Sequence, residues 1–249
     1  AMLGEGGMGA VYRAYDVHLH RAVALKVMHG SLASRPEFQQ RFMQEARAAA
    51  RLDHPSIVKI FDFGMTQSVL YMVMEYIDGG SLAGYINRMQ ERQQVVRLDE
   101  ALPLLAQVAD ALGYAHRQGV IHRDVKPDNI LIKQLDEVRG PGNLPLRPVV
   151  TDFGLAKLLE GGVDTRTGSF MGTLAYMSPE QALGKPLDGR SDLYSLGVIL
   201  YQLTTGRLPF EIASPTEAVR KHMSDQPLAP AEANPELPEA VARVAARAV

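Results

Sequence analysis

The sequence of 249 residues contains no cysteine. It can therefore form no disulfide, thiol nucleophile or cysteine-ligated zinc site, which fits a reducing compartment. An excess of one charge is lacking as well, because 26 basic and 28 acidic residues give a formal net charge of -2. No block of like charge is present, so nothing favours a nucleic-acid or polyanion partner.

The sequence also lacks a hydrophobic run long enough to cross a bilayer. Its most apolar stretch, residues 193–203, includes Tyr194, Ser195 and Gln202 and is too short for a membrane span. The first residues, AMLGEGG, have neither the basic nor the apolar region of a secretory signal. We expect a cytoplasmic domain, and the sequence leaves open whether a longer protein carries a membrane anchor elsewhere.

Apolar residues make up 46% of the chain, which is enough for one large domain or two small lobes. Ser34 is expected to cap the first helix, with Glu37 three residues later. A change from strands to helices places a lobe boundary at residues 77–80, which gives lobes of residues 1–77 and 78–249. The elements predicted from β-prone runs and from helical spacing are strands at 10–15, 22–28, 56–64 and 69–77 and helices at about 35–52, 102–119 and 192–205.

Residues 4–11 read GEGGMGAV, a Gly-x-Gly-x-x-Gly pattern followed by valine. Alone this pattern is weak evidence, because it also describes a flexible turn. In a dinucleotide-binding fold a helix would start here, whereas this sequence predicts a strand. Glycines let a backbone approach phosphates closely and present N-H groups to them, so a glycine-rich turn between strands can cover a triphosphate. Val11 would then pack on the base of the nucleotide.

Lys26 lies in the second predicted strand, where an isolated lysine is usually only solvated. Because side chains alternate along a strand, Val23 and Leu25 share one face while Ala24 and Lys26 share the other. The small Ala24 leaves room for a flat ligand on the face of Lys26. Glu45 in the first predicted helix could orient Lys26 by an ion pair, and a solvated helix residue is the ordinary alternative.

The densest group of polar side chains lies in residues 120–131, VIHRDVKPDNIL. Transfer of the γ-phosphoryl group of ATP needs a carboxylate to accept the proton of the attacking hydroxyl, metal ligands, and cations for the developing charge. Asp124 fits the base, Lys126 fits the cation and Asn129 fits a ligand of Mg²⁺. Asp152 of the DFG sequence supplies a second, acidic metal ligand. A loop of asparagine and aspartate turns is the alternative interpretation.

Together with GEGGMGAVYRAYD at residues 4–16 and GTLAYMSPEQA at residues 172–182, these motifs resemble those of eukaryotic-type protein kinases. They look most like the bacterial Ser/Thr kinases of that superfamily, and the resemblance covers nearly the whole chain. It implies an α+β protein-kinase fold of two lobes, a small antiparallel sheet with one main helix and a larger, mainly helical lobe. It also implies ATP and Mg²⁺, with Mn²⁺ as an alternative metal.

The resemblance assigns roles to individual residues. It implies a Lys26–Glu45 ion pair, Met74 as the gate at the back of the adenine pocket, and Asp192 as a brace for the catalytic loop. The catalytic set is then Asp124, Lys126, Lys26 and Glu45, and the metal ligands are Asn129 and Asp152. The implied nucleotide contacts, with backbone groups of Glu75 and Ile77 on adenine, are Gly4, Glu5, Gly6, Gly9, Val11, Ala24, Lys26, Met74, Glu75 and Ile77.

The expected acceptors are Ser and Thr hydroxyls of proteins, because Lys126 and Thr173 resemble the Ser/Thr-directed kinases. Thr173 is the expected substrate-docking residue. Arg123 beside the base resembles the subclass whose activation segment, here residues 152–180, is ordered by phosphorylation. Self-association for phosphorylation in trans is a further expectation. Loop composition is the ordinary alternative for the candidate phosphosites, which are Thr165, Thr167 and Ser169.

Three features depart from the family pattern. The loop between the predicted strands at 130–132 and 149–151 is longer than the roughly two to five residues of most hairpins, so we interpret it as a surface insertion, with docking as the alternative. Most of the first strand before the glycine motif is missing. The sequence ends before the arginine that pairs with Glu180 of SPE in the family, so the chain looks like a fragment of the kinase domain.

Two other functions compete with an active Ser/Thr kinase. A pseudokinase would bind nucleotide and partners without transferring phosphate. The intact set of Lys26, Glu45, Asp124, Asn129 and Asp152 argues against it. A small-molecule phosphotransferase would share the fold, and the GT and SPE sequences, which dock protein substrates in the family, argue against that alternative.

Overall fold

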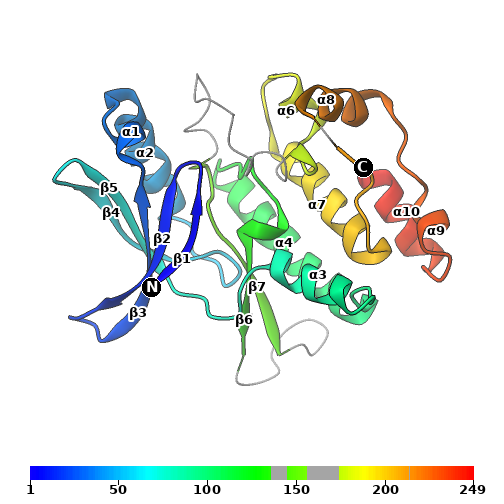
Figure 1. The fold of residues 1–249 in the computed structure, drawn as a ribbon, viewed down its shortest axis with the longest axis horizontal. Helices are drawn as coiled ribbons and strands as arrows, with labels where there is room; N and C mark the ends of the chain where they lie inside the picture. Colours follow the sequence, from blue (N-terminus) through cyan, green and yellow to red (C-terminus); the bar gives the residue numbers. More distant parts are fainter. Residues whose placement is uncertain (136–144, 156–173, 213) are drawn as a thin grey trace.

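The structure is a computed structural model and describes residues 1–135, 145–155, 174–212 and 214–249. Two lobes lie side by side, the first built around strands and the second mainly around helices (Figure 1). The predicted α+β class with two lobes is confirmed.

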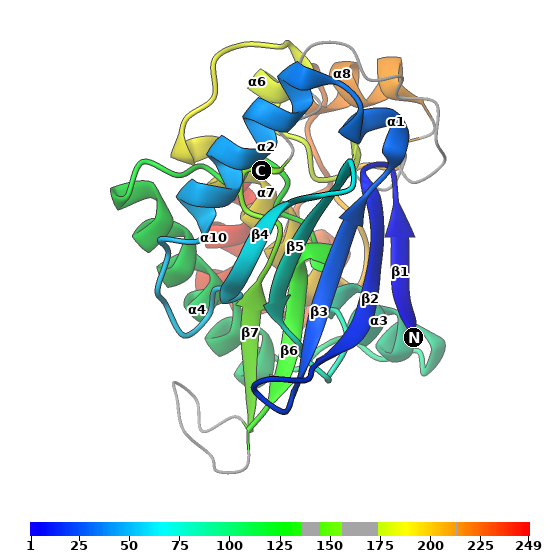
Figure 2. The same cartoon turned by 90° about the vertical axis from the view of Figure 1, so that its left-hand side faces the viewer.

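An antiparallel sheet with the strand order β1-β2-β3-β5-β4 forms the first lobe. The β-prone runs correctly predict β2 to β5, although β4 begins four residues later than predicted. A first strand, β1, pairs with β2 at the edge of the sheet, ahead of the glycine turn. Figure 2 shows the strands side by side, with a helix beside β4. The strands are β1 (Met2–Gly6), β2 (Gly9–Asp16), β3 (Arg21–Met28), β4 (Ile60–Thr66) and β5 (Val69–Glu75).

That helix is α2 (Pro36–Ala49), which follows the single turn α1 (Gly30–Ala33). Its apolar residues recur every three or four positions, so they line one face of the helix. This face packs against the sheet and closes the core of the first lobe. The buried residues of the face are Phe38, Phe42, Ala46 and Ala49.

The predicted cap of this helix is wrong. Arg35 occupies the N-cap position of α2 and makes no side-chain cap bond. Ser34 instead ends α1, and its hydroxyl donates to the carbonyl of Ser31 at 3.2 Å. The start of α2 is set by Pro36, whose fixed φ suits the first helical position and whose missing N-H is not needed there.

The second lobe is organised around α4 and α7, which pack against each other. The spacing of apolar residues correctly predicts both. Helix α7 begins three residues before the predicted start because the carboxylate of Asp188 caps it by accepting the N-H of Arg190. The helices are α3 (Leu82–Glu91), α4 (Leu98–Arg117), the 3₁₀ turn η1 (Pro127–Asn129), α6 (Pro179–Ala182), α7 (Gly189–Thr205), α8 (Pro215–Ser224), α9 (Pro230–Ala233) and α10 (Glu239–Ala248).

A short hairpin of β6 (Ile130–Gln134) and β7 (Leu146–Val150) lies at the boundary with the first lobe. Both strands extend into the stretch interpreted as a loop, so the loop is shorter than predicted at both ends. Its residues 136–144, with the suggested docking role, lie outside the described residues. In the parts of the chain that the structure describes, no helix is long and apolar enough to cross a membrane.

Candidate active site

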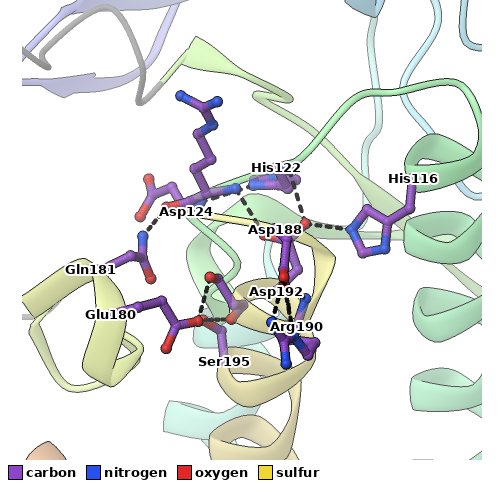
Figure 3. Close-up of polar contacts among 11 residues, drawn as sticks. His116, His122, Asp124, Glu180, Gln181, Asp188, Arg190, Asp192 and Ser195 are labelled. Atoms are coloured by element: carbon purple, nitrogen blue, oxygen red, sulfur yellow. Dashed lines mark hydrogen bonds and ion pairs between the residues drawn. The ribbon is translucent and has the colours of Figure 1, made fainter. Parts of the chain in front are cut away.

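The catalytic loop, residues 120–129, is held by the carboxylate of Asp192 (Figure 3). Asp192 lies in the first turn of α7 and is only 1% exposed. Its Oδ2 accepts the backbone N-H of His122 at 2.9 Å, and its Oδ1 accepts the N-H of Arg123 at 2.8 Å. Nε2 of His116 also lies 2.7 Å from Oδ2. The predicted brace by Asp192 is confirmed.

His122 connects this loop to the backbone that precedes the DFG sequence. The N-H of Asp124 donates to Nδ1 of His122 at 3.2 Å, so the hydrogen of a neutral ring lies on Nε2. Nε2 then donates to the carbonyl of Thr151 at 2.8 Å. The buried ring also packs on Phe153, with ring centroids 4.6 Å apart. One side chain thus fixes the spacing between Asp124 and the DFG sequence.

The side chains of Asp124, Lys126 and Asn129 meet in one cluster. Oδ2 of Asp124 lies 2.9 Å from Nζ of Lys126 and accepts Nδ2 of Asn129 at 3.0 Å. The same Nδ2 donates to the Asp124 backbone carbonyl at 2.7 Å. None of the residues described here donates a bond to Oδ1 of Asn129, so that oxygen is available as a ligand.

Lys26 reaches the DFG sequence from β3. Its ammonium group is buried and lies 2.8 Å from Oδ2 of Asp152. Burial raises the pKa of the Asp152 carboxyl, but the positive charge and hydrogen bond of Lys26 outweigh it and keep the pKa below its ordinary value. Asp152 therefore stays ionised.

The expected Lys26–Glu45 ion pair is not the one that this structure shows, because Lys26 pairs with Asp152 instead. The side chain of Glu45 instead lies against the backbone of Gly154 in the DFG sequence. A Cβ atom added at Gly154 would lie 2.8 Å from Oε2 of Glu45. The position of α2, which the sequence does not specify, therefore brings Glu45 to the backbone of the DFG sequence.

The strand register places Ala24 and Lys26 on the same face as the candidate nucleotide contacts. Lys26 is opposite Val11 on β2, and Ala24 is opposite Met74 on β5. Since directly opposed residues of an antiparallel pair share a face, the alternation predicted for β3 is confirmed. Behind Met74, a small apolar cavity extends to Asp152 and is lined largely by aliphatic side chains.

A model of the protein kinase domain matches residues 1–244 of the sequence. The chain belongs to the protein kinase family. The serine/threonine-protein kinase PksC of Streptomyces coelicolor is 42% identical over the whole chain, and PrkC of Bacillus subtilis is 38% identical over 99% of it. The chain spans 44% and 36% of the lengths of these two relatives, so it covers less than half of each.

The crystal structure of the PknI kinase domain of Mycobacterium tuberculosis gives a TM-score of 0.69 at 29% identity. That match covers 100% of this chain and 86% of the PknI chain. The relatives support a bacterial Ser/Thr kinase domain rather than a pseudokinase. Kinases of this family use ATP and a divalent metal and act on proteins.

The kinase glycine motif forms the end of β1, a tight turn and the start of β2. Gly4, Glu5 and Gly6 lie on β1. Gly9 is buried where a Cβ atom would lie 2.0 Å from the carbonyl oxygen of Val27, so no larger residue fits. His29, which the sequence does not single out, ties down the turn because its Nε2 lies 2.9 Å from the carbonyl of Gly6.

The segment that joins the kinase lobes begins at Glu75. The N-H of Glu75 donates to the carbonyl of Lys59, so any backbone bond from Glu75 to adenine must use its carbonyl oxygen. Its carboxylate pairs with Nζ of Lys133 on β6 at 2.6 Å, which links the end of the sheet to the second lobe. Ile77 follows as a buried residue.

Part of the predicted site lies outside the described residues, namely Thr165, Thr167, Ser169 and Thr173. Among the residues that the structure does describe, no cluster of three or more His, Asp or Glu side chains could hold a metal. The metal ligands expected from the sequence, Asn129 and Asp152, offer an amide and a carboxylate. The N-H of Thr151, the residue before Asp152, donates to the carbonyl of Asn129 at 2.9 Å, which brings the two backbone segments together.

Three residues that the sequence analysis does not predict support the catalytic loop and the end of the activation segment. Gln181 bonds the carbonyl of Arg123, and only its capping-box spacing from Ser178 is readable in the sequence. His222 on α8 bonds the carbonyl of Leu174, which no sequence signal indicates. Ser191 donates its hydroxyl to Oε1 of Glu180. Glu180 thus has a hydrogen-bond partner within the described chain, which is different from the arginine expected from the family pattern.

Proposed function

We propose that the chain transfers the γ-phosphoryl group of ATP to Ser and Thr hydroxyls of proteins. One observation carries the proposal: the Asp124 carboxylate contacts both Lys126 and Asn129 within 3.0 Å, on a loop fixed by Asp192. A carboxylate in this setting can orient an attacking hydroxyl and accept its proton. The cation beside it can stabilise charge that develops on the transferred group.

We assign the remaining chemistry as follows. Asp124 is the base, and Lys126 neutralises negative charge at the γ-phosphate. Lys26 binds the phosphates that stay with the nucleotide. Its 2.8 Å contact with Asp152, the proposed metal ligand, supports a position beside these phosphates. Glu45 orients Lys26 in the family, and in this structure Lys26 pairs with Asp152 instead, so the Lys26–Glu45 pair would need a rearrangement of these side chains.

Asn129 and Asp152 would hold the metal, which we propose to be Mg²⁺, with Mn²⁺ as an alternative. Two hard oxygen donors suit either ion, since Mg²⁺ usually keeps several waters and phosphate oxygens as its other ligands. The Oδ1 atom of Asn129, which accepts no hydrogen bond from the described residues, and the lowered pKa of Asp152 support this assignment. Bound metal would neutralise charge on the phosphate oxygens.

The adenosine and phosphate contacts that we propose come from the first lobe. Gly4, Glu5, Gly6 and Gly9 would cover the phosphates, while Val11 and Ala24 would pack on the base. The carbonyl of Glu75 and the N-H of Ile77 would bond adenine, with Met74 behind it. The shared face of Val11, Ala24, Lys26 and Met74 supports this arrangement.

Regulation by phosphorylation is part of the proposal. Thr165, Thr167 and Ser169 are the candidate acceptors, Thr173 would dock substrate, and transient self-association would allow phosphorylation in trans. We infer a cytoplasmic domain, which the absence of cysteine supports, with no nucleic-acid partner. A membrane anchor elsewhere in a longer protein is compatible with this inference.

The decisive test compares Asp124→Asn with Asp110→Asn, an equivalent change at an exposed position on α4. Phosphoryl transfer to a protein substrate should fall at least about a hundredfold in Asp124→Asn, because the amide cannot accept the proton. ATP binding by calorimetry should persist, and Asp110→Asn should match the wild type. Unchanged transfer by the Asp124→Asn protein would refute the role of Asp124.

A further inference from the structure

We propose that Gln181 is a positioning residue for the catalytic base, which it holds in place through the peptide bond that precedes Asp124. The inference rests on the proposed kinase function and adds a residue to it. Figure 3 shows Gln181 extending from α6 toward the backbone beside Asp124. Gln181 has no role in the site as the sequence predicts it.

Both ends of the Gln181 amide are engaged. Its Nε2 donates to the carbonyl of Arg123 at 2.7 Å, and its Oε1 accepts the N-H of Ser178 at 3.0 Å. The backbone N-H of Gln181 in turn donates to Oγ of Ser178 at 3.3 Å, which completes a capping box at the start of α6. A single side chain therefore joins the cap of α6 to the catalytic loop.

The two bonds require an amide at this position. A backbone carbonyl can only accept and a backbone N-H can only donate, so Nε2 must face Arg123 and Oε1 must face Ser178. Either glutamate or glutamine completes a capping box. Only glutamine also offers a donor to Arg123, because ionised glutamate is acceptor-only. The capping box alone would accept glutamate at position 181, whereas the hydrogen bond to the catalytic loop requires glutamine.

The peptide bond that Gln181 holds lies directly before the base. Its carbonyl, from Arg123, accepts from Gln181, and its N-H, from Asp124, donates to Nδ1 of His122. Arg123 has a positive φ of 68°, a conformation that a side chain other than glycine adopts only when its surroundings impose it. Asp192 fixes the N-H on one side of Arg123, and Gln181 fixes the carbonyl on the other.

The experiment separates the loop contact from the helix cap. Gln181→Glu keeps the acceptor for the Ser178 N-H and replaces the donor to Arg123 with an oxygen that repels the carbonyl. Ser178→Ala is the matched control, because it removes the other half of the capping box and leaves the Arg123 contact in place. The two proteins are compared with the wild type by hydrogen exchange of the catalytic-loop amides and by steady-state phosphoryl transfer.

We expect faster exchange at residues 122–124 in Gln181→Glu and not in Ser178→Ala. We also expect kcat to fall about tenfold or more in Gln181→Glu, because a small misplacement of a catalytic group is costly. The KM for ATP should be unchanged, because the proposed adenosine contacts lie in the other lobe. A Gln181→Met protein, which lacks the donor without adding charge, should resemble Gln181→Glu in exchange.

Wild-type exchange at residues 122–124 in both Gln181 variants would overturn the inference, whatever the activity. Faster exchange with unchanged kcat would overturn the positioning role and leave a structural contact. An inactive wild-type protein would instead count against the proposed function, and the exchange comparison would still decide the contact.

Discussion

Replacement of Asp192 should show how much of the stability of the second lobe depends on the support of the catalytic loop. Asp192→Ala removes the acceptor of two backbone N-H groups, from His122 and Arg123, in a site that is almost inaccessible to water. An unsatisfied buried donor costs about 1–3 kcal/mol, so the two together cost about 2–6 kcal/mol. Losing the contact with His116 adds less to this cost, because the partly exposed ring of His116 can bond to water instead.

A loss of that size is a large share of the roughly 5–15 kcal/mol that stabilises a domain. Asp192→Asn keeps one oxygen and replaces the other with an amide NH₂ that faces a backbone donor. The loss of unfolding free energy in Asp192→Asn should therefore be at least half of that in Asp192→Ala. Phosphoryl transfer should fall in both proteins, because the backbone that carries Asp124 is no longer held.

The assay is urea unfolding of the wild type and the two variants at one pH, followed by circular dichroism. Asp188→Asn is the control, since the same substitution four residues earlier affects an exposed N-cap where asparagine is as effective as aspartate. Its ion pair with Arg190 is exposed to solvent, so losing it should change the stability little. An equal loss in Asp188→Asn and Asp192→Asn would refute the reasoning.

Two further predictions use other contacts. Gly154→Ala should destabilise the protein by about 1–3 kcal/mol in urea unfolding, because φ at Gly154 is 70°, and its new Cβ should displace the Glu45 side chain. The control Gly113→Ala, inside α4, should instead stabilise the protein by about 0.5–1 kcal/mol, and a loss of stability in both variants would contradict the argument from the Gly154 backbone. Burial lowers the pKa of His222 in the folded protein, and the bond to the carbonyl of Leu174 only partly opposes this. As the pH falls, His222 is therefore protonated in the unfolded chain before it is protonated in the folded protein. The free energy of unfolding should decrease as the pH drops below about 6.5. His222→Gln should flatten the pH dependence of the melting temperature in that range, and an unchanged slope would exclude His222 as its source.

The catalytic loop could be predicted from the sequence because its chemistry is contiguous. Asp124, Lys126 and Asn129 lie within six residues of one another, and local turn geometry is enough to bring them into one cluster. The face shared by Ala24 and Lys26 could be predicted for a similar reason, since alternation along a strand is a local property. The positions of Asp192 and of the DFG aspartate followed from the family resemblance.

The ion pair of Lys26 could not be predicted in the same way. Its partner depends on where α2 lies against the sheet, and that position results from the packing of Phe38, Phe42 and their neighbours. Two carboxylates, from Asp152 and Glu45, are candidates for the same ammonium group, and the sequence does not order their distances. The cap of α2 failed for a local reason, because Ser34 was already used to end the preceding turn.

The residues that hold the backbone around Asp124 share one feature, which is that all of them lie in the second lobe. Within the described chain, Asp192, Gln181 and His122 hold the backbone of residues 122–124, and each belongs to a segment after the lobe boundary. Lys26 from the first lobe contacts Asp152 and not this backbone. A movement of the first lobe can therefore alter the Lys26–Asp152 contact while the backbone that carries Asp124 keeps its support. The hydrogen bonds that hold this backbone do not depend on how closely the two lobes approach each other.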